Sequence, residues 1–300
     1  MDKQGNISTE PSFQTALPSS TKRVEKRGYI GGFVKYLIML LISLVMVFPF
    51  YWMAVSSLKT PVELSSLPPV WWPSSPTFES FAKIFDVVPF GSSLMNSIIV
   101  TTAATASILL TSILAGYVFA KYHFRGKNVL FVIVLSTMMV PQFVLIVPLY
   151  HMMNGLHLVN TFFGLILPNM ANAFGIFLMK QFIEGIPDDL IEAARLDGAS
   201  EWKIIWKVIV PLLKPAASAL ILFAFVYQWN NFLWPLTIVQ TPEMNTVVLA
   251  LNSLRSYTTS VEYTNVVMAG AVIGILPSVA LFLWLQKFFI EGIAMTGIKG

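Results

Sequence analysis

Long apolar runs, separated by short polar and charged stretches, dominate the chain. No charged residue occurs between Lys35 and Lys59 or between Asp86 and Lys121. Each interval exceeds the ~20 residues that an α-helix needs to cross the hydrocarbon core of a bilayer. The pattern therefore predicts one membrane-spanning helix in each interval. A cleaved signal peptide would have a shorter apolar region nearer to the N-terminus, so we interpret the first run as a span.

The later apolar runs predict four more spans. The uncharged stretch from Asn128 to Met179 is too long for one span, and it becomes polar at His151–Asn160, where we expect an external turn. A fifth run extends from about Pro215 to Gln240 and a sixth from Val266 to Gln286, with an external loop expected at Thr241–Tyr263. The sequence thus predicts an all-α membrane protein with six transmembrane helices.

Two polar stretches flank the first span. Residues 1–28 are rich in polar and charged residues without apolar periodicity, and we predict a disordered tail there. Residues 29–300 then form the membrane domain. From Lys59 to about Gly91 six prolines interrupt the chain, beside two adjacent tryptophans of the kind common at membrane–water interfaces. We expect an external loop there, with a short helix at Thr77–Phe85.

The composition indicates the class of protein, and the distribution of charge predicts its orientation in the membrane. The chain is 56% hydrophobic and 11% charged, with a mean hydropathy of +0.71, whereas soluble domains carry about 25% charged residues. Six spans put both termini on one side, and sixteen of the 19 Lys and Arg residues fall on that side. The exceptions are Lys59, Lys83 and Arg255. Because basic residues concentrate on the inner side, both termini and the 180–214 loop are predicted to be cytoplasmic.

The sequence shows no catalytic or metal-binding constellation. It has no cysteine, and His123, His151 and His157 lack metal-ligand spacing. Neither a P-loop nor a Gly-x-Ser-x-Gly motif occurs. We therefore expect no catalytic residue, no bound metal and no cofactor on this chain.

A charged stretch between the fourth and fifth runs has the pattern of two short helices joined by a sharp turn. Asp189 can cap the first helix, and Glu192 three residues later completes a capping box. Gly198 stands where that helix ends, because glycine adopts the left-handed conformation without strain. Ser200 can cap a second helix that runs towards Pro211. The pattern predicts a charged helix-turn-helix between two spans.

Ala193 and Ala194 leave a smooth strip on the first helix, where another surface could approach closely. We interpret the helix-turn-helix as a knob that docks onto a partner. The alternative is an ordinary polar loop with two capped helices.

The order Glu-Ala-Ala, three residues, Gly, and then Val208-Ile209-Val210-Pro211 resembles the cytoplasmic EAA loop of bacterial ABC importer permeases. Valine stands where isoleucine and leucine are commoner in that family. The resemblance implies a coupling loop at about 184–211 that fits a groove on an ATPase subunit. The residues that it implies for coupling to the ATPase are Glu192, Ala193, Ala194, Asp197, Gly198 and Pro211.

Three further stretches resemble the carbohydrate, maltose-type branch of these permeases, and its second permease subunit in particular. They are Pro-Pro-Val-Trp-Trp-Pro at 68–73, Trp-Asn-Asn-Phe at 229–232 and the Ile298-Lys299-Gly300 end. The resemblance implies a family core at about 88–290, with the first span packed peripherally. It also implies that the Ile298-Lys299-Gly300 end contacts the ATPase subunits.

The polar group Gln228, Trp229, Asn230 and Asn231 lies within the fifth run. Amides inside a span are costly unless they pair or face water. Gln228 and Asn231 are three residues apart and can share one helix face. Either these side chains line a solute path, where amides and aromatic faces suit sugars, or they form interhelical hydrogen bonds that hold the bundle together. The sequence leaves both interpretations open.

The resemblance as a whole implies a multi-pass protein of the bacterial cytoplasmic membrane that forms half of the translocation path of an ATP-driven importer for a sugar or oligosaccharide. The implied partners are a second homologous permease, two ATPase subunits that bind ATP and Mg, an extracytoplasmic solute-binding protein and the lipid bilayer, but no nucleic acid. Glycerol phosphate and related polyols remain open as substrates.

Other classes of protein are the alternatives. A stand-alone secondary transporter or channel would work without these partners, and secondary transporters usually show internal repeats and intramembrane ionisable residues. An intramembrane enzyme would need a nucleophile with its base, or a metal site. The sequence shows none of these features.

Overall fold

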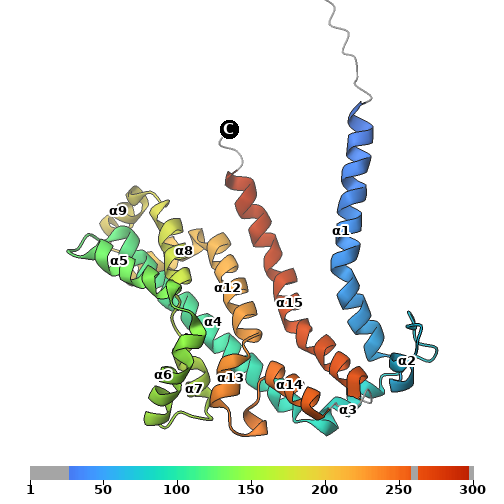
Figure 1. The fold of residues 1–300 in the computed structure, drawn as a ribbon. Coiled ribbons are helices and arrows are strands. Elements are labelled where there is room, and N and C mark those ends of the chain that lie inside the picture. The colour runs from blue at the N-terminus through green and yellow to red at the C-terminus, as the bar shows by residue number, and fades with distance from the viewer. Residues whose placement is uncertain (1–26, 258–262, 297–300) are drawn as a thin grey trace, which may run out of the picture. The chain divides into compact units, whose positions relative to one another are not determined.

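The computed structural model describes residues 27–257 and 263–296 (Figure 1). Within these ranges every regular element is a helix and no strand occurs, which agrees with the all-α prediction. The α-helices are, in chain order, α1 (Arg27–Ser57), α2 (Pro61–Ser65), α3 (Glu79–Val87), α4 (Phe90–Lys121), α5 (Lys127–Ser136), α6 (Gln142–Gly155), α7 (Phe162–Ile166), α8 (Ala173–Glu184), α9 (Asp188–Leu196), α10 (Glu201–Ile204), α11 (Val210–Leu212), α12 (Lys214–Trp229), α13 (Leu233–Ile238), α14 (Val247–Tyr257) and α15 (Thr264–Thr296).

The chain divides into two compact units, Met1–Pro49 and Phe50–Gly300. In the first unit the structure describes the first part of α1, whose side chains from Phe33 to Pro49 are exposed. The predicted disordered tail at 1–28 lies almost wholly outside the described residues. The peripheral position of the first span concerns both units together, and it stays a prediction.

The helices that could span a membrane lie in the predicted apolar runs. Three stretches are long and apolar enough to cross a bilayer, namely Gly32–Ser57, Phe90–Lys121 and Thr264–Phe288. Three helix pairs pass the same test only together, because each pair bends at a short break. The bends are 101° between α5 and α6, 47° between α7 and α8, and 83° between the Glu201–Leu212 arm and α12. Length and composition thus allow three spans in the described residues, or up to six if each bent pair is one span.

Helix α4 is the centre of the second unit, where it packs most extensively on α8 and α12. Two glycines permit the close approach of α4 and α8: a Cβ built at Gly116 would lie 2.8 Å from the Cβ of Met179, and one built at Gly175 would lie 2.3 Å from Ser112 Oγ. Small residues allow such close contact between helices whose surfaces are otherwise equally apolar. The position of α8 on α4 therefore depends on both glycines.

The N-terminal end of α4 holds the segment that follows α13. Asn96 donates from Nδ2 to the backbone oxygens of Glu243 and Asn245, at 2.7 and 3.0 Å. Ser97 accepts from the backbone N–H of Val247 at 2.8 Å, where α14 begins. Both side chains are buried, so these bonds satisfy backbone groups that would otherwise be costly to bury. The start of α14 is thereby fixed to one end of α4.

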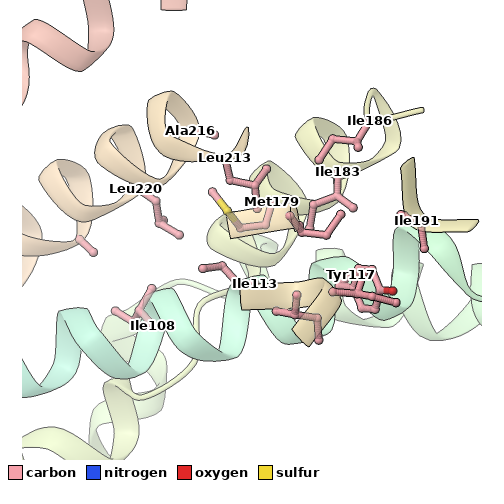
Figure 2. Packing of buried hydrophobic residues seen from close by; sticks show 14 residues of the cluster. Ile108, Ile113, Tyr117, Met179, Ile183, Ile186, Ile191, Leu213, Ala216 and Leu220 are labelled. Atoms are coloured by element: carbon pink, nitrogen blue, oxygen red, sulfur yellow. The ribbon is translucent and has the colours of Figure 1, made fainter. Parts of the chain in front are cut away.

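The largest described core lies where α4, α8 and α12 meet the 186–213 segment. Its buried members, shown in Figure 2, are Ile108, Ile113, Tyr117, Met179, Ile183, Ile186, Ile191, Ile204, Ile205, Ile209, Leu213, Ala216, Leu220 and Ala224. Six of them come from the 186–213 segment itself, namely Ile186, Ile191, Ile204, Ile205, Ile209 and Leu213. This stretch is therefore packed onto the helix bundle by its apolar side chains.

The predicted external loop at Thr241–Tyr263 contains a helix that the sequence did not predict, α14 at Val247–Tyr257; its external position stays a prediction. Val247, Ala250 and Leu254 are buried in a cluster with Trp229. Their spacing of three and four residues is that of one helix face. By contrast, the predicted short helix at Thr77–Phe85 is present as α3, slightly displaced.

Candidate functional site

The first helix of the predicted coupling loop is α9, and its N-terminus is held by a distant residue. Pro187 occupies the cap position, and no side chain caps the helix, so the predicted Asp189–Glu192 capping box is wrong. Helix α9 begins at Asp188, two residues earlier than a cap at Asp189 would place it. Lys121 at the end of α4 donates to Asp188 Oδ1 at 2.7 Å and to the backbone oxygen of Ile186 at 2.6 Å.

This ion pair combines a buried lysine with an exposed carboxylate. The side chain of Lys121 is 7% exposed and that of Asp188 is 73% exposed. The hydrogen bond and the positive charge of Lys121 hold the pKa of Asp188 below its ordinary value. Asp188 also lies in the first turn of α9, where a negative charge is favourable towards the helix dipole. The start of α9 is thus joined to the end of α4.

The turn after α9 has the predicted geometry. Gly198 has φ +77°, in the left-handed region that glycine adopts without strain. The backbone N–H of Gly198 donates to Arg195 and that of Ala199 to Ala194, both at 3.0 Å, which closes the end of the helix. Ser200 caps α10, because its Oγ accepts from the backbone N–H of Lys203 at 3.5 Å. The predicted helix-turn-helix is therefore confirmed.

The two alanines of the Glu-Ala-Ala motif face different surroundings. Glu192 and Ala193 are exposed, whereas Ala194 is half-buried against the core that contains Ile191. The predicted smooth strip is thus wrong for Ala194, which faces the protein's own interior. Of the other predicted coupling residues, Asp197, Gly198 and Pro211 are exposed.

An apolar row that the sequence analysis missed lies on the exposed side of α9. Leu190 is 46% exposed and Leu196 is 89% exposed, and Ala193 lies between them at a spacing of three residues. Residues three apart are neighbours on a helix surface. The signal was present in the sequence, since the row follows the same spacing that defines a helix face. This row and Glu192 form the exposed surface of α9.

A second polar link joins α4, α9 and α10. Tyr117 of α4 donates its hydroxyl to Glu201 Oε2 at 2.8 Å, and Arg195 of α9 donates from Nε to Glu201 Oε1 at 2.9 Å. Tyr117 is 1% exposed. Since Tyr117 and Glu201 are 84 residues apart in the chain, no local pattern could have revealed this contact. Glu201 therefore fixes both helices of the loop to the bundle.

The predicted solute-path residues do not share one face or one environment. Helix α12 ends at Trp229, so Gln228 and Asn231 do not share a helix face, and that prediction is wrong. Trp229 is buried and donates from Nε1 to the backbone oxygen of Gly274 at 2.8 Å. It therefore joins α12 to α15, as the interhelical interpretation expected. Gln228 is buried beside it.

The two asparagines lie in the break between α12 and α13. Asn230 is exposed and donates from Nδ2 to the backbone oxygen of Val226 at 2.8 Å. Asn231 lines a cavity of about 170 Å³ together with Gln142 and Asn169. Only Asn231 thus shares a cavity with amides from other helix pairs.

Amides also occur at the other helix breaks, and the sequence analysis missed these positions. Gln142 begins α6, and its Oε1 accepts from the hydroxyl of Tyr227. Asn169 precedes the break before α8, and Asn172 caps α8 through the backbone N–H of Gly175. Interrupted helices are tolerated inside membranes where the freed backbone groups find partners or line a cavity. The signal in the sequence was a proline directly before an amide, at Pro141-Gln142 and Pro168-Asn169.

The predicted ATPase-contacting end, Ile298, Lys299 and Gly300, lies outside the described residues. In the ranges 27–257 and 263–296 no group of three or more His, Cys, Asp or Glu residues could hold a metal ion.

These features define a multi-span helical membrane protein that carries a charged helix-turn-helix between two apolar helices and has amides at the breaks of its helices. A family model described as "Binding-protein-dependent transport system inner membrane component" matches residues 107–294. The chain belongs to this family. The resemblance to ABC importer permeases is thereby confirmed.

Named relatives cover nearly the whole chain. It is 36% identical to the "Arabinooligosaccharides transport system permease protein AraQ" of Bacillus subtilis (strain 168), over 88% of this chain and 94% of that protein. It is 32% identical to the "Lactose transport system permease protein LacG" of Rhizobium radiobacter, over 89% and 96%. It is 31% identical to the "sn-glycerol-3-phosphate transport system permease protein UgpE" of Yersinia enterocolitica, over 85% and 94%.

A solved structure supports the fold. The chain matches one chain of the "Crystal structure of a bacterial ABC transporter involved in the import of the acidic polysaccharide alginate" with a TM-score of 0.76 and 25% identity. The match covers 88% of this chain and 98% of that chain. The protein therefore has the fold of an ABC importer permease.

Proposed function

We propose that this chain is one of two permease subunits of an ATP-driven importer for a sugar or oligosaccharide. The observation that carries the proposal is α9, whose exposed Glu192, Ala193 and Leu196 are presented by a helix fixed to α4 at both ends. A helix presented in this way suits insertion into a groove on a partner. The transport systems named for the relatives support a sugar as the solute, with glycerol phosphate as the nearest other candidate.

In this proposal the chain performs no catalysis and binds no cofactor. Two cytoplasmic ATPase subunits bind ATP and Mg, and α9 of this chain enters a groove on one of them. The Ile298-Lys299-Gly300 end reaches the same ATPase pair. A solute-binding protein delivers the solute from the outer side of the bacterial cytoplasmic membrane. A second homologous permease completes the path.

The solute path in this proposal runs past the helix breaks. Asn231, Gln142 and Asn169 line one cavity, and Tyr227 is bonded to Gln142. Amides and a phenol hydroxyl offer both donors and acceptors to sugar hydroxyls. Trp229 belongs to the packing between α12 and α15 and not to the path.

The test of the function uses the whole assembly. The four kinds of subunit are co-expressed, purified together and reconstituted in lipid vesicles, and ATP hydrolysis is measured with arabino-oligosaccharides, lactose, alginate oligosaccharides and sn-glycerol-3-phosphate. We expect one sugar class to stimulate hydrolysis only when the binding protein is present. Uptake by this chain alone, without the ATPase subunits, would refute the proposal.

The orientation has its own test, because the natural chain has no cysteine. Val62 is 80% exposed in the predicted external loop, and Arg125 is exposed in the short loop after α4. A single cysteine at Val62 should react with an impermeant thiol reagent added outside intact cells. A single cysteine at Arg125 should react only after permeabilisation. The opposite result would place α9 on the outer side.

A further inference from the structure

The arm that follows the turn at Gly198 runs across the direction of α12. It consists of α10, the π-helical turn η3 (Ile205–Ile209) and α11, and the Glu201–Leu212 arm makes an angle of 83° with α12. In the proposed topology α12 crosses the membrane. The arm therefore lies almost parallel to the membrane plane, next to Lys214 at the cytoplasmic end of α12.

The arm has one buried and one exposed face. Ile204, Ile205 and Ile209 are buried in the main core. On the other side, Trp202 is 60% exposed and Trp206 is 42% exposed. Tryptophan has a large apolar ring with one N–H donor, and it is enriched where an apolar phase meets water. Two exposed tryptophans one turn apart thus point to a partner with such a boundary.

Lysines accompany the tryptophans on this exposed side. Lys203 and Lys207 are exposed, as is Lys214 beyond the end of the arm. None of the three ion pairs found in residues 27–257 and 263–296 includes these lysines. The arm's own carboxylate, Glu201, is bonded to Tyr117 and Arg195. We call Trp202, Lys203, Trp206 and Lys207 the Trp–Lys face; its charge is positive.

The exposed surface of α9 has the opposite charge. Asp188, Asp189, Glu192 and Asp197 are exposed on or beside α9. A partner groove that accepts this acidic helix is expected to be basic, and a basic surface repels lysines. The Trp–Lys face is therefore poorly matched to the same groove. It matches an anionic surface with an apolar layer beneath it.

We propose that the Trp–Lys face binds the headgroups of acidic phospholipids in the cytoplasmic leaflet. The tryptophan rings enter the boundary between headgroups and acyl chains, and the lysines contact the lipid phosphates. Helices that lie in the interface combine an apolar face with basic residues in this way. The inference rests on the cytoplasmic placement of the loop in the proposed function, and it assigns to the arm a contact separate from that of α9.

The experiment uses the complete importer in vesicles of phosphatidylcholine and phosphatidylglycerol at a molar ratio of three to one. A photoreactive phosphatidylglycerol is included, or in a parallel sample a photoreactive phosphatidylcholine, and mass spectrometry locates the cross-links. We expect the acidic lipid to be enriched over the neutral one at residues 201–214. Each lysine removed in Lys203→Gln/Lys207→Gln should lower this enrichment about fivefold, because one basic residue near an acidic membrane contributes about 1 kcal/mol.

The control variant is Lys35→Gln/Arg125→Gln, which removes the same charge from two exposed positions elsewhere. It should leave the cross-links at 201–214 unchanged. The inference is overturned if the natural importer shows no acidic-lipid enrichment there, or if both variants lose it equally. It is also overturned if Lys203→Gln/Lys207→Gln loses the ATPase while its lipid cross-links remain, because the face then belongs to the ATPase.

Two further measurements keep the result interpretable. Co-purification of the ATPase from the same samples tests the proposed function separately, since that contact is assigned to α9. If the Lys203→Gln/Lys207→Gln variant fails to assemble, the natural importer is cross-linked at low and high salt. Enrichment that does not fall with salt would then contradict an electrostatic lipid contact.

Discussion

The loop that contains α9 and the break between α12 and α13 both interrupt apolar helices with polar residues, yet the two regions use these residues in opposite ways. At α9 the carboxylates are exposed, and the groups that hold them, Lys121 and Tyr117, are buried in α4. At the break, Trp229 and Gln228 are buried and Asn230 is exposed. The exposed carboxylates of the α9 loop are thus held by buried groups of α4, whereas at the break the residues 228–231 combine packing and cavity lining.

The largest effect is expected at the packed side of the break. Trp229→Ala removes a buried ring and its hydrogen bond to Gly274, which should destabilise the protein by about 3–5 kcal/mol. Asn230→Ala is the matched control, and its effect should stay within about 0.5 kcal/mol, because the side chain is exposed. Thermal unfolding of the purified importer measures both. Similar midpoints for the two variants would show that Trp229 is not a packing residue.

The second effect separates the two alanines of the loop. Ala194→Leu adds volume against the core around Ile191 and should destabilise the protein by about 1–3 kcal/mol. Ala193→Leu points outwards, so the thermal midpoint should be unchanged while co-purification of the ATPase falls. The comparison fails if Ala193→Leu is the variant that unfolds early, or if neither variant affects stability or attachment.

A smaller effect is expected at the turn. Gly198→Ala places a Cβ at φ +77°, which costs about 1–2 kcal/mol for a residue in the left-handed conformation. The strain should change the angle between α9 and the arm and lower ATPase attachment without preventing membrane insertion. Gly126→Ala is a suitable control, since Gly126 has φ +85° in a different loop. Equal loss of attachment in both variants would mean that turn strain acts through general instability.

The smallest effect on stability should accompany a clear effect on coupling. Tyr117→Phe removes one hydroxyl that donates to Glu201, at a cost of about 0.5–1.5 kcal/mol. The ATPase should remain attached, but solute-stimulated hydrolysis should fall, because the polar link from α4 through Glu201 is lost while that from Lys121 to Asp188 remains. Glu184→Gln is the matched control, since it breaks an ion pair with Lys180 within one helix. Unchanged stimulation in Tyr117→Phe would show that this bond is only structural.

Local sequence patterns predicted much of the loop that contains α9, because the residues that form its turn and its second cap lie close together in the chain. The left-handed turn at Gly198 and the cap at Ser200 needed no knowledge of distant contacts. The Asp189–Glu192 capping box failed because Asp188 binds Lys121, which is 67 residues earlier in the chain. The link from Tyr117 to Glu201 was hidden for the same reason.

The apolar runs show a second limit of prediction from sequence. Apolar length predicted where helices cross, but it could not reveal that a run breaks, because a broken span has the same composition as a continuous one. The fifth run is interrupted after Trp229 and becomes helical again only at Leu233, where α13 begins. Helix α14 was missed because its 11 residues are too few to cross a bilayer, so a search for apolar runs of span length passes over it.

Helix α4 is a long helix that is bonded to other segments near both of its ends. Its 32 residues correspond to a length of about 48 Å. Tyr117 and Lys121 bond to the α9 region near one end. Near the other end, Asn96 bonds to the segment before α14 and Ser97 bonds to the first residue of α14. A tilt imposed at one end of α4 therefore displaces the other end, because the helix itself bends little. In the proposed topology, these bonds connect segments on opposite surfaces of the membrane through one helix.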